Sequence, residues 1–217
     1  MKMNAKTSVD LATDGLRDLI LSRELVAGEP IRQEALSERL DVSRTPLRQA
    51  LQILSEEGLV TQTDYRGARV AAIKPEDVRD LFDMRLALEP IALGEAIARM
   101  TKIDLAQAEM ALDEAENVAS PMRLSKLNWH FHRTLYAPCG RAMLLDVIEK
   151  LNRNASRAEI IALSIARRVE RSACEHEKLL QACRNGDVDK AGKALNDHLW
   201  AARRDAIAAV ENLMENE

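Results

Sequence analysis

Aromatic side chains are scarce in this chain. Phe, Trp and Tyr together make up 3% of its 217 residues, so the hydrophobic core has to be built mainly from aliphatic side chains. The chain also has only eight Gly and six Pro, the two residues that interrupt helices most strongly. Hydrophobic residues reach 47% and charged residues 30%, which is ordinary for a globular protein with a core. The composition therefore favours a mainly α-helical fold.

Long apolar runs are absent as well. No stretch approaches the ~18 consecutive apolar residues of a membrane-spanning helix, and residues 1–15 hold no apolar segment followed by a small-residue cleavage site. The three cysteines, Cys139, Cys174 and Cys183, lack CxxC spacing, which favours reduced thiols over a disulfide framework or a zinc knuckle. These absences predict a cytoplasmic protein with no membrane partner.

The net charge of −4 argues against a nucleic-acid partner until it is divided along the chain. Residues 42–74 carry five basic and three acidic side chains, a net charge of +2. Residues 75–217 carry 20 basic and 24 acidic side chains, a net charge of −4. A phosphate backbone meets local basicity rather than the sum over the whole chain, so residues 42–74 are a candidate DNA-binding segment.

Residues 1–74 have the pattern of three short helices followed by a β-hairpin. Helical spacing predicts helices over 9–23, over 33–40, and from the N-cap Ser43 to Glu57. After Gly58 the apolar pattern changes to two short β-type runs, 59–63 and 68–72, joined by a turn. We expect these residues to form one winged helix-turn-helix domain.

From Pro75 onward the chain shows no strand pattern. The breaks between apolar periodic segments predict six helices, at about 75–99, 103–118, 121–137, 141–166, 168–185 and 187–215. Their short connections favour an antiparallel helical bundle. We expect residues 75–217 to form a second, all-helical domain.

The segment Gln33–Val60 has the pattern of a helix-turn-helix. Its apolar positions can pack two helices across a tight turn: Leu36, Leu40, Val42, Leu47, Leu51 and Leu54. Arg44, Thr45 and Arg48 then lie on the outer face at the start of the second helix, the end by which a recognition helix enters the major groove. Arg can pair with guanine O6 and N7, while Thr suits phosphates.

A helix pair whose arginines only solvate its surface would show the same pattern. The predicted hairpin favours DNA binding instead, because it carries Arg66 and Gly67 at its tip. A basic tip with a glycine can approach a phosphate backbone or minor groove closely, as a wing does.

Three of the four histidines, His132, His176 and His198, lie on helix faces that should be inside the bundle. Asn128 precedes His132 by four residues and shares its face. A buried imidazole needs a partner, and three that converge would form a metal site. Taken one at a time, each histidine is equally explained as a core residue with a hydrogen-bond partner. His130 lies off this face and is expected to be a surface or packing residue.

The sequence resembles the GntR family of winged-helix regulators, of the FadR type. The resemblance rests on the run from Val42 to Leu51 (VSRTPLRQAL), on Glu56 to Val60 (EEGLV), and on Arg66 to Val70 (RGARV) at the wing. It implies operator DNA as a partner, a homodimer that reads an inverted repeat, and by family default a repressor. One departure from the pattern matters: the family commonly has Glu-Arg-x-Leu-Ala in the helix before the turn, with the Arg near DNA, and this chain has Glu34 at the position of that Arg. Glu34 cannot make that contact.

The resemblance also covers the helical domain. Members carry Asp and three His that bind a divalent metal in the effector cavity; the matching positions here are Asn128, His132, His176 and His198. Zinc or nickel would suit these ligands, with weaker affinity because Asn128 lacks the negative charge of Asp. Arg85 matches a family arginine, and Arg157 is a weaker candidate of the same kind, for a small carboxylate effector.

Two other functions are compatible with parts of the pattern. A metal-dependent enzyme could use the three histidines, but no general base lies beside them at HExxH-type spacing and no nucleophile or Gly-rich motif is present. We therefore expect no enzymatic activity. An architectural DNA-binding dimer with a ligand-free bundle is the second alternative.

Overall fold

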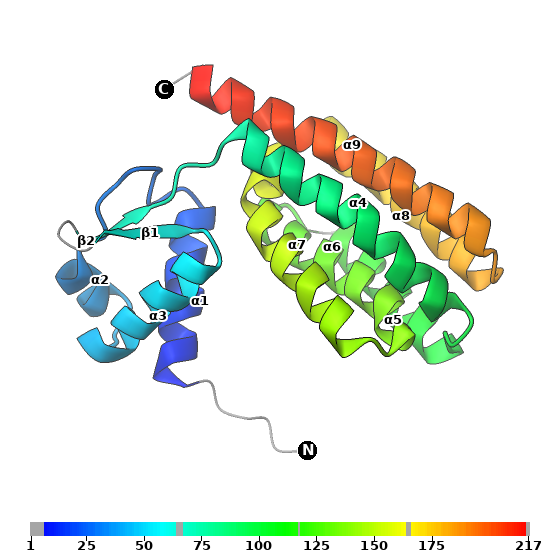
Figure 1. The fold of residues 1–217 in the computed structure, drawn as a ribbon, viewed down its shortest axis with the longest axis horizontal. Helices are drawn as coiled ribbons and strands as arrows, with labels where there is room; N and C mark the ends of the chain where they lie inside the picture. The colour runs from blue at the N-terminus through cyan, green and yellow to red at the C-terminus, as the bar shows by residue number, and fades with distance from the viewer. Residues whose placement is uncertain (1–6, 64–66, 117, 164–165, 216–217) are drawn as a thin grey trace. The chain divides into compact units, whose positions relative to one another are not determined.

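The computed structural model describes residues 7–63, 67–116, 118–163 and 166–215 (Figure 1). The chain divides into two compact units, Met1–Ile73 and Lys74–Glu217, each with its own buried core. The fold class predicted from the sequence is confirmed: a helical N-terminal unit with a two-stranded sheet precedes an all-helical unit.

The N-terminal unit contains three helices and one antiparallel hairpin. Its elements are α1 (Ser8–Leu21), α2 (Gln33–Arg39), α3 (Arg44–Glu56), β1 (Val60–Thr63) and β2 (Gly67–Val70). Helix α1 begins with a capping box, in which the Thr7 side chain accepts from the Asp10 amide and the Asp10 carboxylate accepts from the Thr7 amide. In the hairpin, Val60 pairs with Val70 and Thr63 with Gly67.

The turn between α2 and α3 is short and is held by two hydrogen bonds between Ser37 and Val42. Asp41 has a φ of 50°, in the left-handed region that Asp tolerates better than most residues. The Val42 amide then donates to the Ser37 carbonyl at 3.1 Å, and the Ser37 hydroxyl donates back to the Val42 carbonyl. Ser43 occupies the N-cap position of α3, as predicted, although its side chain makes no capping hydrogen bond.

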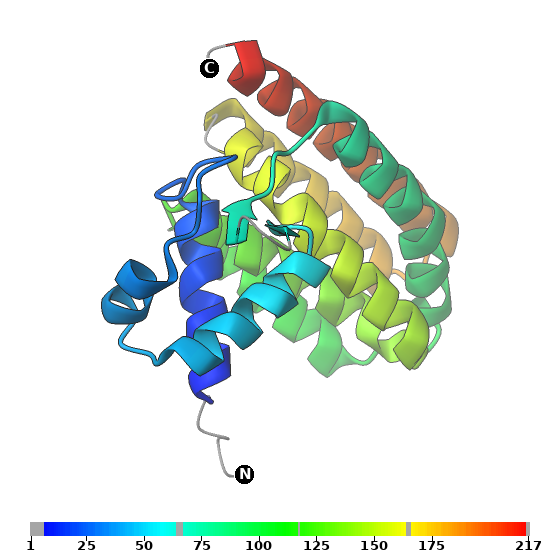
Figure 2. The same ribbon diagram turned by 60° about the vertical axis from the view of Figure 1, so that its left-hand side comes forward.

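The described residues of the second unit form a bundle of six α-helices, as predicted. They are α4 (Pro75–Ile97), α5 (Lys102–Glu116), α6 (Pro121–Tyr136), α7 (Ala142–Leu163), α8 (Ala166–Arg184) and α9 (Val188–Glu215), with a short 3₁₀ turn, η1 (Ala137–Cys139), after α6. Helices α4 and α9 lie side by side along much of their length in both views (Figures 1 and 2).

The structure corrects the predicted break between the fourth and fifth helices of this unit. The sequence predicts helices at about 141–166 and 168–185, whereas α8 already begins at Ala166 and includes Arg167 and Arg168. Arginine is a good helix former, so two adjacent arginines are no reason for a helix to end.

The core of the bundle is aliphatic around a few large rings. Phe131, Leu135 and Tyr136 from α6 pack against Leu179 from α8 and Leu195 from α9. The same interior also holds buried polar side chains, each at most 2% exposed: Arg85, Glu89, His132 and His198. Buried charged groups are rare unless they are paired, so these four residues are candidates for a functional role.

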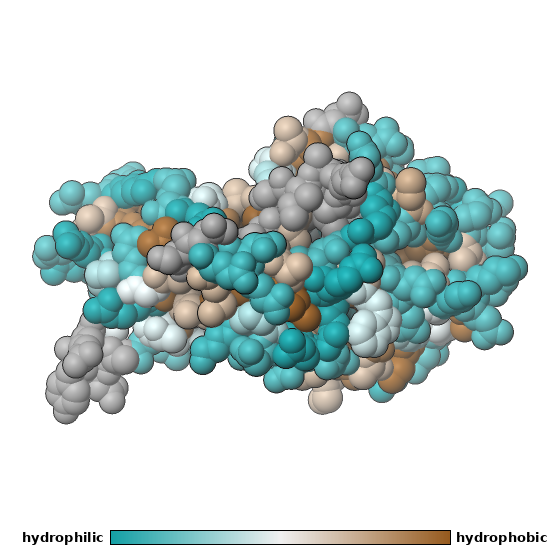
Figure 3. All heavy atoms as spheres, turned by 90° about the horizontal axis from the view of Figure 1, so that it is seen from above, coloured by the Kyte–Doolittle hydropathy of each residue, from teal (hydrophilic) through white to brown (hydrophobic). Residues whose placement is uncertain are grey.

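One face of the molecule is mainly polar. Figure 3 shows a face covered largely by hydrophilic residues, with separate hydrophobic patches among them. Among the described helices, none is both long and apolar enough to cross a membrane.

Candidate DNA-binding face and metal centre

The exposed face of α3 carries the three residues that the helix-turn-helix pattern singled out. Leu47, Ala50, Leu51 and Leu54 are buried against the rest of the unit, which leaves the opposite face of the helix to solvent. Arg44, Thr45 and Arg48 lie on that exposed face within the first turns of α3. This is the geometry that a recognition helix requires.

Arg44 has an acidic neighbour on α2. Its guanidinium forms an ion pair with the Glu34 carboxylate, although the two side chains are 67% and 76% exposed. Glu34 is the acidic residue that the sequence analysis noted in place of an arginine. Its carboxylate pairs with Arg44, the first residue of α3.

A groove of about 480 Å³ runs between α3 and the hairpin. Thr45, Arg48 and Gly67 line it together with several glutamine side chains: Gln33, Gln49, Gln52 and Gln62. Gly67 has a φ of 75°, a backbone conformation that favours glycine at the start of β2. Arg69 donates to the Gly28 carbonyl at 2.7 Å and so fixes the hairpin to the preceding loop. Arg66, the other predicted tip residue, lies outside the described residues.

Three histidines from three different helices meet inside the second unit. His132 comes from α6, His176 from α8 and His198 from α9, and their candidate ligand atoms all lie within 4.8 Å of one another. Their side chains are buried, and the ring centroids of His176 and His198 are 4.5 Å apart. The sequence placed each histidine on an inner helix face; the structure shows that the three faces converge.

Hydrogen bonds assign the tautomers of two of these rings. His132 Nδ1 lies 3.0 Å from the Tyr136 hydroxyl, which donates its only proton to Glu89 at 2.7 Å. The hydroxyl can therefore only accept from His132, so Nδ1 carries the proton. His198 Nδ1 lies 2.9 Å from the Glu175 carboxylate, which also only accepts. In the neutral form of either ring, Nε2 is then the unprotonated nitrogen, and the two Nε2 atoms face each other.

These two Nε2 atoms lie 3.3 Å apart. Two lone pairs at that separation repel each other unless a positive charge lies between them. Two nitrogen ligands at about 2.0–2.1 Å from a tetrahedral zinc ion would be separated by roughly the same distance. Burial, and then the nearby His198, His176 and Arg85, hold the pKa of His132 well below its usual value, which keeps the ring in the neutral form that binds metals. The donor set therefore fits a divalent cation.

A cavity of about 380 Å³ adjoins the cluster between α5, α6 and α8. Asn128, Ser172 and His176 are among its lining residues, so one histidine of the cluster borders the cavity. The carboxylates that line it are Glu109, Asp113, Glu116 and Glu177. Asn128 is half-buried one helical turn before His132, where its amide oxygen could reach an ion only as a neutral ligand.

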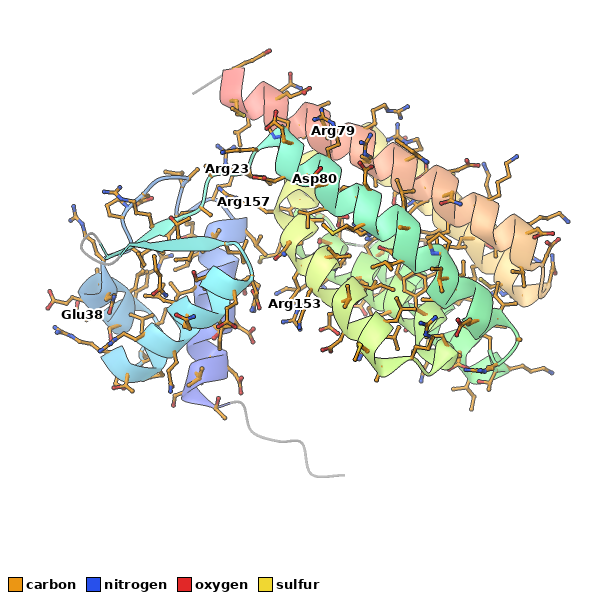
Figure 4. The ribbon with its side chains drawn as sticks, in the orientation of Figure 1. Arg23, Glu38, Arg79, Asp80, Arg153 and Arg157 are labelled. Carbon is orange, nitrogen blue, oxygen red and sulfur yellow. The ribbon has the colours of Figure 1, made fainter. Side chains whose placement is uncertain are left out.

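Arg85 is enclosed by carboxylates. Its side chain is 1% exposed, its Nε donates to Glu89 at 2.6 Å, and its Nη1 donates to Glu159 on α7. Burial alone would lower the pKa of Arg85, but the two carboxylates raise it above its usual value. Arg157 is also buried and lies on α7, the helix that carries Glu159 (Figure 4).

Sequence reasoning missed four residues around the cluster: Glu89, Tyr136, Glu159 and Glu175. Some of them had a local signal. Glu89 follows Arg85 by four residues, and Tyr136 follows His132 by four, so each pair shares a helix face. Glu159 gave no such signal, because its contact with Arg85 joins α7 to α4.

The cysteines are all free thiols, in agreement with their spacing. Cys139 and Cys183 are buried and Cys174 is exposed. Burial raises the pKa of the Cys183 thiol to about 12, so it stays protonated and packs as a small apolar residue.

Comparison with known proteins agrees with both units. Residues 10–70 match the bacterial regulatory proteins of the gntR family, and residues 80–201 match the FCD domain. The chain is 29% identical over 198 residues to the HTH-type transcriptional repressor GlaR of Escherichia coli (strain K12), a match that covers 85% of this chain and 89% of that protein. It is 27% identical over 188 residues to the HTH-type transcriptional repressor RspR of the same strain, covering 83% and 82%.

Solved structures share the fold. A protein proposed to be a GntR transcriptional regulator from Rhodococcus sp. RHA1 aligns with a TM-score of 0.79 at 22% identity, over 94% of this chain and 99% of that chain. A structure described as a metal-free FCD domain aligns with a TM-score of 0.54 at 18% identity, over 65% of this chain and 99% of that chain. The FCD domain is associated with metal binding, and this chain has a cluster of three histidines in that domain. The chain belongs to the GntR family of bacterial regulatory proteins with an FCD domain, and is therefore a DNA-binding transcriptional regulator and not an enzyme.

Proposed function

We propose that this regulator is a cytoplasmic homodimeric repressor that leaves its operator when a small carboxylate metabolite enters the helical unit. The observation that carries the proposal is the convergence of His132, His176 and His198 inside a unit that is joined to a helix-turn-helix. The names of the two relatives from Escherichia coli, both transcriptional repressors, support repression.

In this proposal the N-terminal unit reads the operator. Arg44 and Arg48 pair with guanine in the major groove, and Thr45 binds a phosphate. Gly67 lets the hairpin approach the backbone or the minor groove, where Arg66 adds a positive charge. The exposure of Arg44, Thr45 and Arg48 on one face of α3 supports these roles.

His132, His176 and His198 would hold a divalent cation such as zinc or nickel, with Asn128 as an uncharged oxygen ligand. The cation, when bound, supplies a positive charge that attracts a carboxylate. Asn128 and His176 both line the adjoining cavity, so an effector in that cavity would lie beside the cluster. Arg85 and Arg157 are the candidate partners for the effector's second polar group. Arg85 would have to exchange Glu89 or Glu159 for the effector, since both now bind it.

The homodimer would be assembled mainly through the helical unit. Met84 and Ile91 lie seven residues apart on one face of α4 and are 45% and 46% exposed. A closed twofold interface would remove such side chains from water and would place two recognition helices on an inverted repeat. A monomer by sedimentation at about micromolar concentration that still binds a palindrome tightly would contradict this part of the proposal.

The main test is an operator titration with small carboxylates. An operator is first selected from random duplex DNA with the purified protein, and its affinity is then measured with and without each of a panel of organic and sugar acids. We expect at least one acid to weaken operator binding by tenfold or more, which is about 1.4 kcal/mol of coupling free energy.

Variants locate the response. His176→Ala should abolish the effect of the acid while leaving operator affinity in its absence nearly unchanged, because residue 176 lies in the helical unit. The matched control is His130→Ala, which replaces an exposed histidine of α6 and should respond as the wild type does. A panel in which no acid shifts either operator affinity or the thermal midpoint would favour the ligand-free architectural dimer.

A further inference from the structure

A continuous chain of polar contacts runs from the histidine cluster through the core of the helical unit. It passes from His132 to Tyr136 on α6, from Tyr136 to Glu89 on α4, from Glu89 to Arg85, and from Arg85 to Glu159 on α7. None of these five side chains is more than 9% exposed. This series of contacts is thus shielded from water throughout. In such an interior a hydrogen bond is stronger, and an unpaired polar group costs more free energy, than at the surface.

The two hydrogen bonds in the middle of this series have a fixed donor and acceptor. Glu89 receives two donors, the Tyr136 hydroxyl at 2.7 Å and Arg85 Nε at 2.6 Å, one on each carboxylate oxygen. Glu89 forms an ion pair with Arg85, and the carboxylate of an ion pair can only accept. The Tyr136 proton is therefore committed to Glu89, and the hydroxyl has only acceptor capacity left for His132.

We propose that Tyr136, held by Glu89, is a positioning residue for the cation at the histidine cluster. It fixes the His132 ring as the Nδ1–H tautomer and so directs the Nε2 lone pair toward the cation. Glu175 does the same for His198 by a direct carboxylate contact at 2.9 Å. The inference rests on the proposed metal function, and it adds that the tautomer is set before any cation binds.

This arrangement also gives Arg85 a defined role. Arg85 acts through Glu89: it orients the carboxylate that accepts from the Tyr136 hydroxyl. Glu159 binds the other side of the guanidinium and anchors it to α7. Partners beyond the metal ligands commonly change metal affinity by about 10–100-fold when they are removed.

The test compares two single-hydroxyl variants of α6. Tyr136→Phe removes only the oxygen between His132 and Glu89. Thr134→Val is the matched control, because it removes a hydroxyl from the same helix that donates only to the His130 carbonyl. Zinc affinity is measured by competition with a chromophoric chelator, and the tautomer of each ring is read from ¹⁵N NMR of histidine-labelled, metal-free protein.

We expect wild type and Thr134→Val to show His132 as the Nδ1–H tautomer and to bind zinc equally. Tyr136→Phe should lose that tautomer signature and bind zinc about 10–100-fold more weakly. Unchanged zinc affinity in Tyr136→Phe would overturn the inference. If that variant fails to fold, the wild-type spectrum decides alone: an Nε2–H tautomer at His132 overturns the inference and an Nδ1–H tautomer supports it. A wild type that takes up no zinc, or any other divalent cation, would overturn the metal site itself, which is a separate result.

Discussion

The Arg44 guanidinium on α3 is paired with the Glu34 carboxylate on α2. The pair joins the first residue of α3 to a residue of α2. Both side chains are largely exposed, so the pair contributes little to folding stability. If Arg44 reads DNA as proposed, a carboxylate beside it would offset part of the positive charge that attracts it to phosphates.

Glu34→Gln should weaken the discrimination between operator and unrelated DNA. Without the carboxylate, Arg44 is available to any nearby phosphate, so affinity for unrelated duplex should rise more than affinity for the operator. Each additional phosphate contact would steepen the dependence of log affinity on log salt by about 0.9. The measurement is fluorescence anisotropy on both duplexes across a salt series.

Glu38→Gln is the control for Glu34→Gln, because Glu38 is exposed one turn further along the same helix (Figure 4). It makes the same change in net charge without removing the partner of Arg44. Equal specificity ratios in the two variants would show that net charge, and not the pairing with Arg44, governs the effect.

Arg44→Ala should cost about 1–3 kcal/mol of operator binding and relax the base preference at one position of each half-site, as expected for the loss of a bidentate contact to guanine. The check is binding to a set of operators that vary one base pair at a time. Arg79→Ala removes an exposed arginine of the helical unit and should bind as the wild type does (Figure 4). If Arg44→Ala and wild type bind every operator equally, α3 does not read the DNA through this residue.

Asn128→Asp should tighten zinc binding on the order of tenfold, about 1.4 kcal/mol, because it adds a negative charge to the set of three neutral imidazoles. His176→Ala should instead lower the metal content of the purified protein. Elemental analysis and chelator competition measure both effects. Asn185→Asp adds the same charge at the exposed end of α8 and should leave zinc affinity unchanged. An equal gain in both Asp variants would indicate a long-range charge effect instead of direct ligation.

In the presence of a chelator, the free energy of unfolding should fall below about pH 6.5. Burial, then His198, His176 and Arg85, hold the folded-state pKa of His132 well below its usual value. Above about pH 6.5 the ring is neutral in both states and contributes nothing. Below it the unfolded chain takes up a proton that the folded protein excludes, so stability falls by up to about 1.4 kcal/mol per pH unit until the depressed folded pKa is reached.

Urea unfolding at about pH 7.5 and about pH 5.5 measures this loss. His132→Gln should have a smaller difference between the two pH values than the wild type. His130→Gln, at an exposed position of the same helix, should keep the wild-type difference. If His132→Gln keeps it as well, other groups cause the acid sensitivity.

The sequence predicts a candidate site correctly where its residues share one face of a single helix. The apolar spacing around Leu47 and Leu51 was enough to predict that Arg44, Thr45 and Arg48 are exposed together. The same reasoning placed His132 and His198 inside the bundle. Periodicity specifies which face a residue occupies, and it succeeds when the neighbouring element covers that face.

Periodicity does not specify which residues meet across helices. The contact between Arg85 and Glu159 joins positions 74 residues apart, and no local spacing marks it. The sequence leaves Arg85 open between an effector contact and a pair with a nearby acid, and the structure shows it buried between two carboxylates. The ion pair of Arg44 with Glu34 was missed for the same reason: Glu34 was recognised as a departure, but its partner lies on the next helix.

The ion pairs around Arg85 also determine the electrical balance of the bundle interior. Glu89, Glu159 and Glu175 place three carboxylates near the histidines, and two guanidinium groups pair with them, those of Arg85 and Arg171. The carboxylates are therefore in excess by one, which favours a cation at the cluster. This excess comes from the surroundings of the cluster, because the side chain at position 128 is itself uncharged.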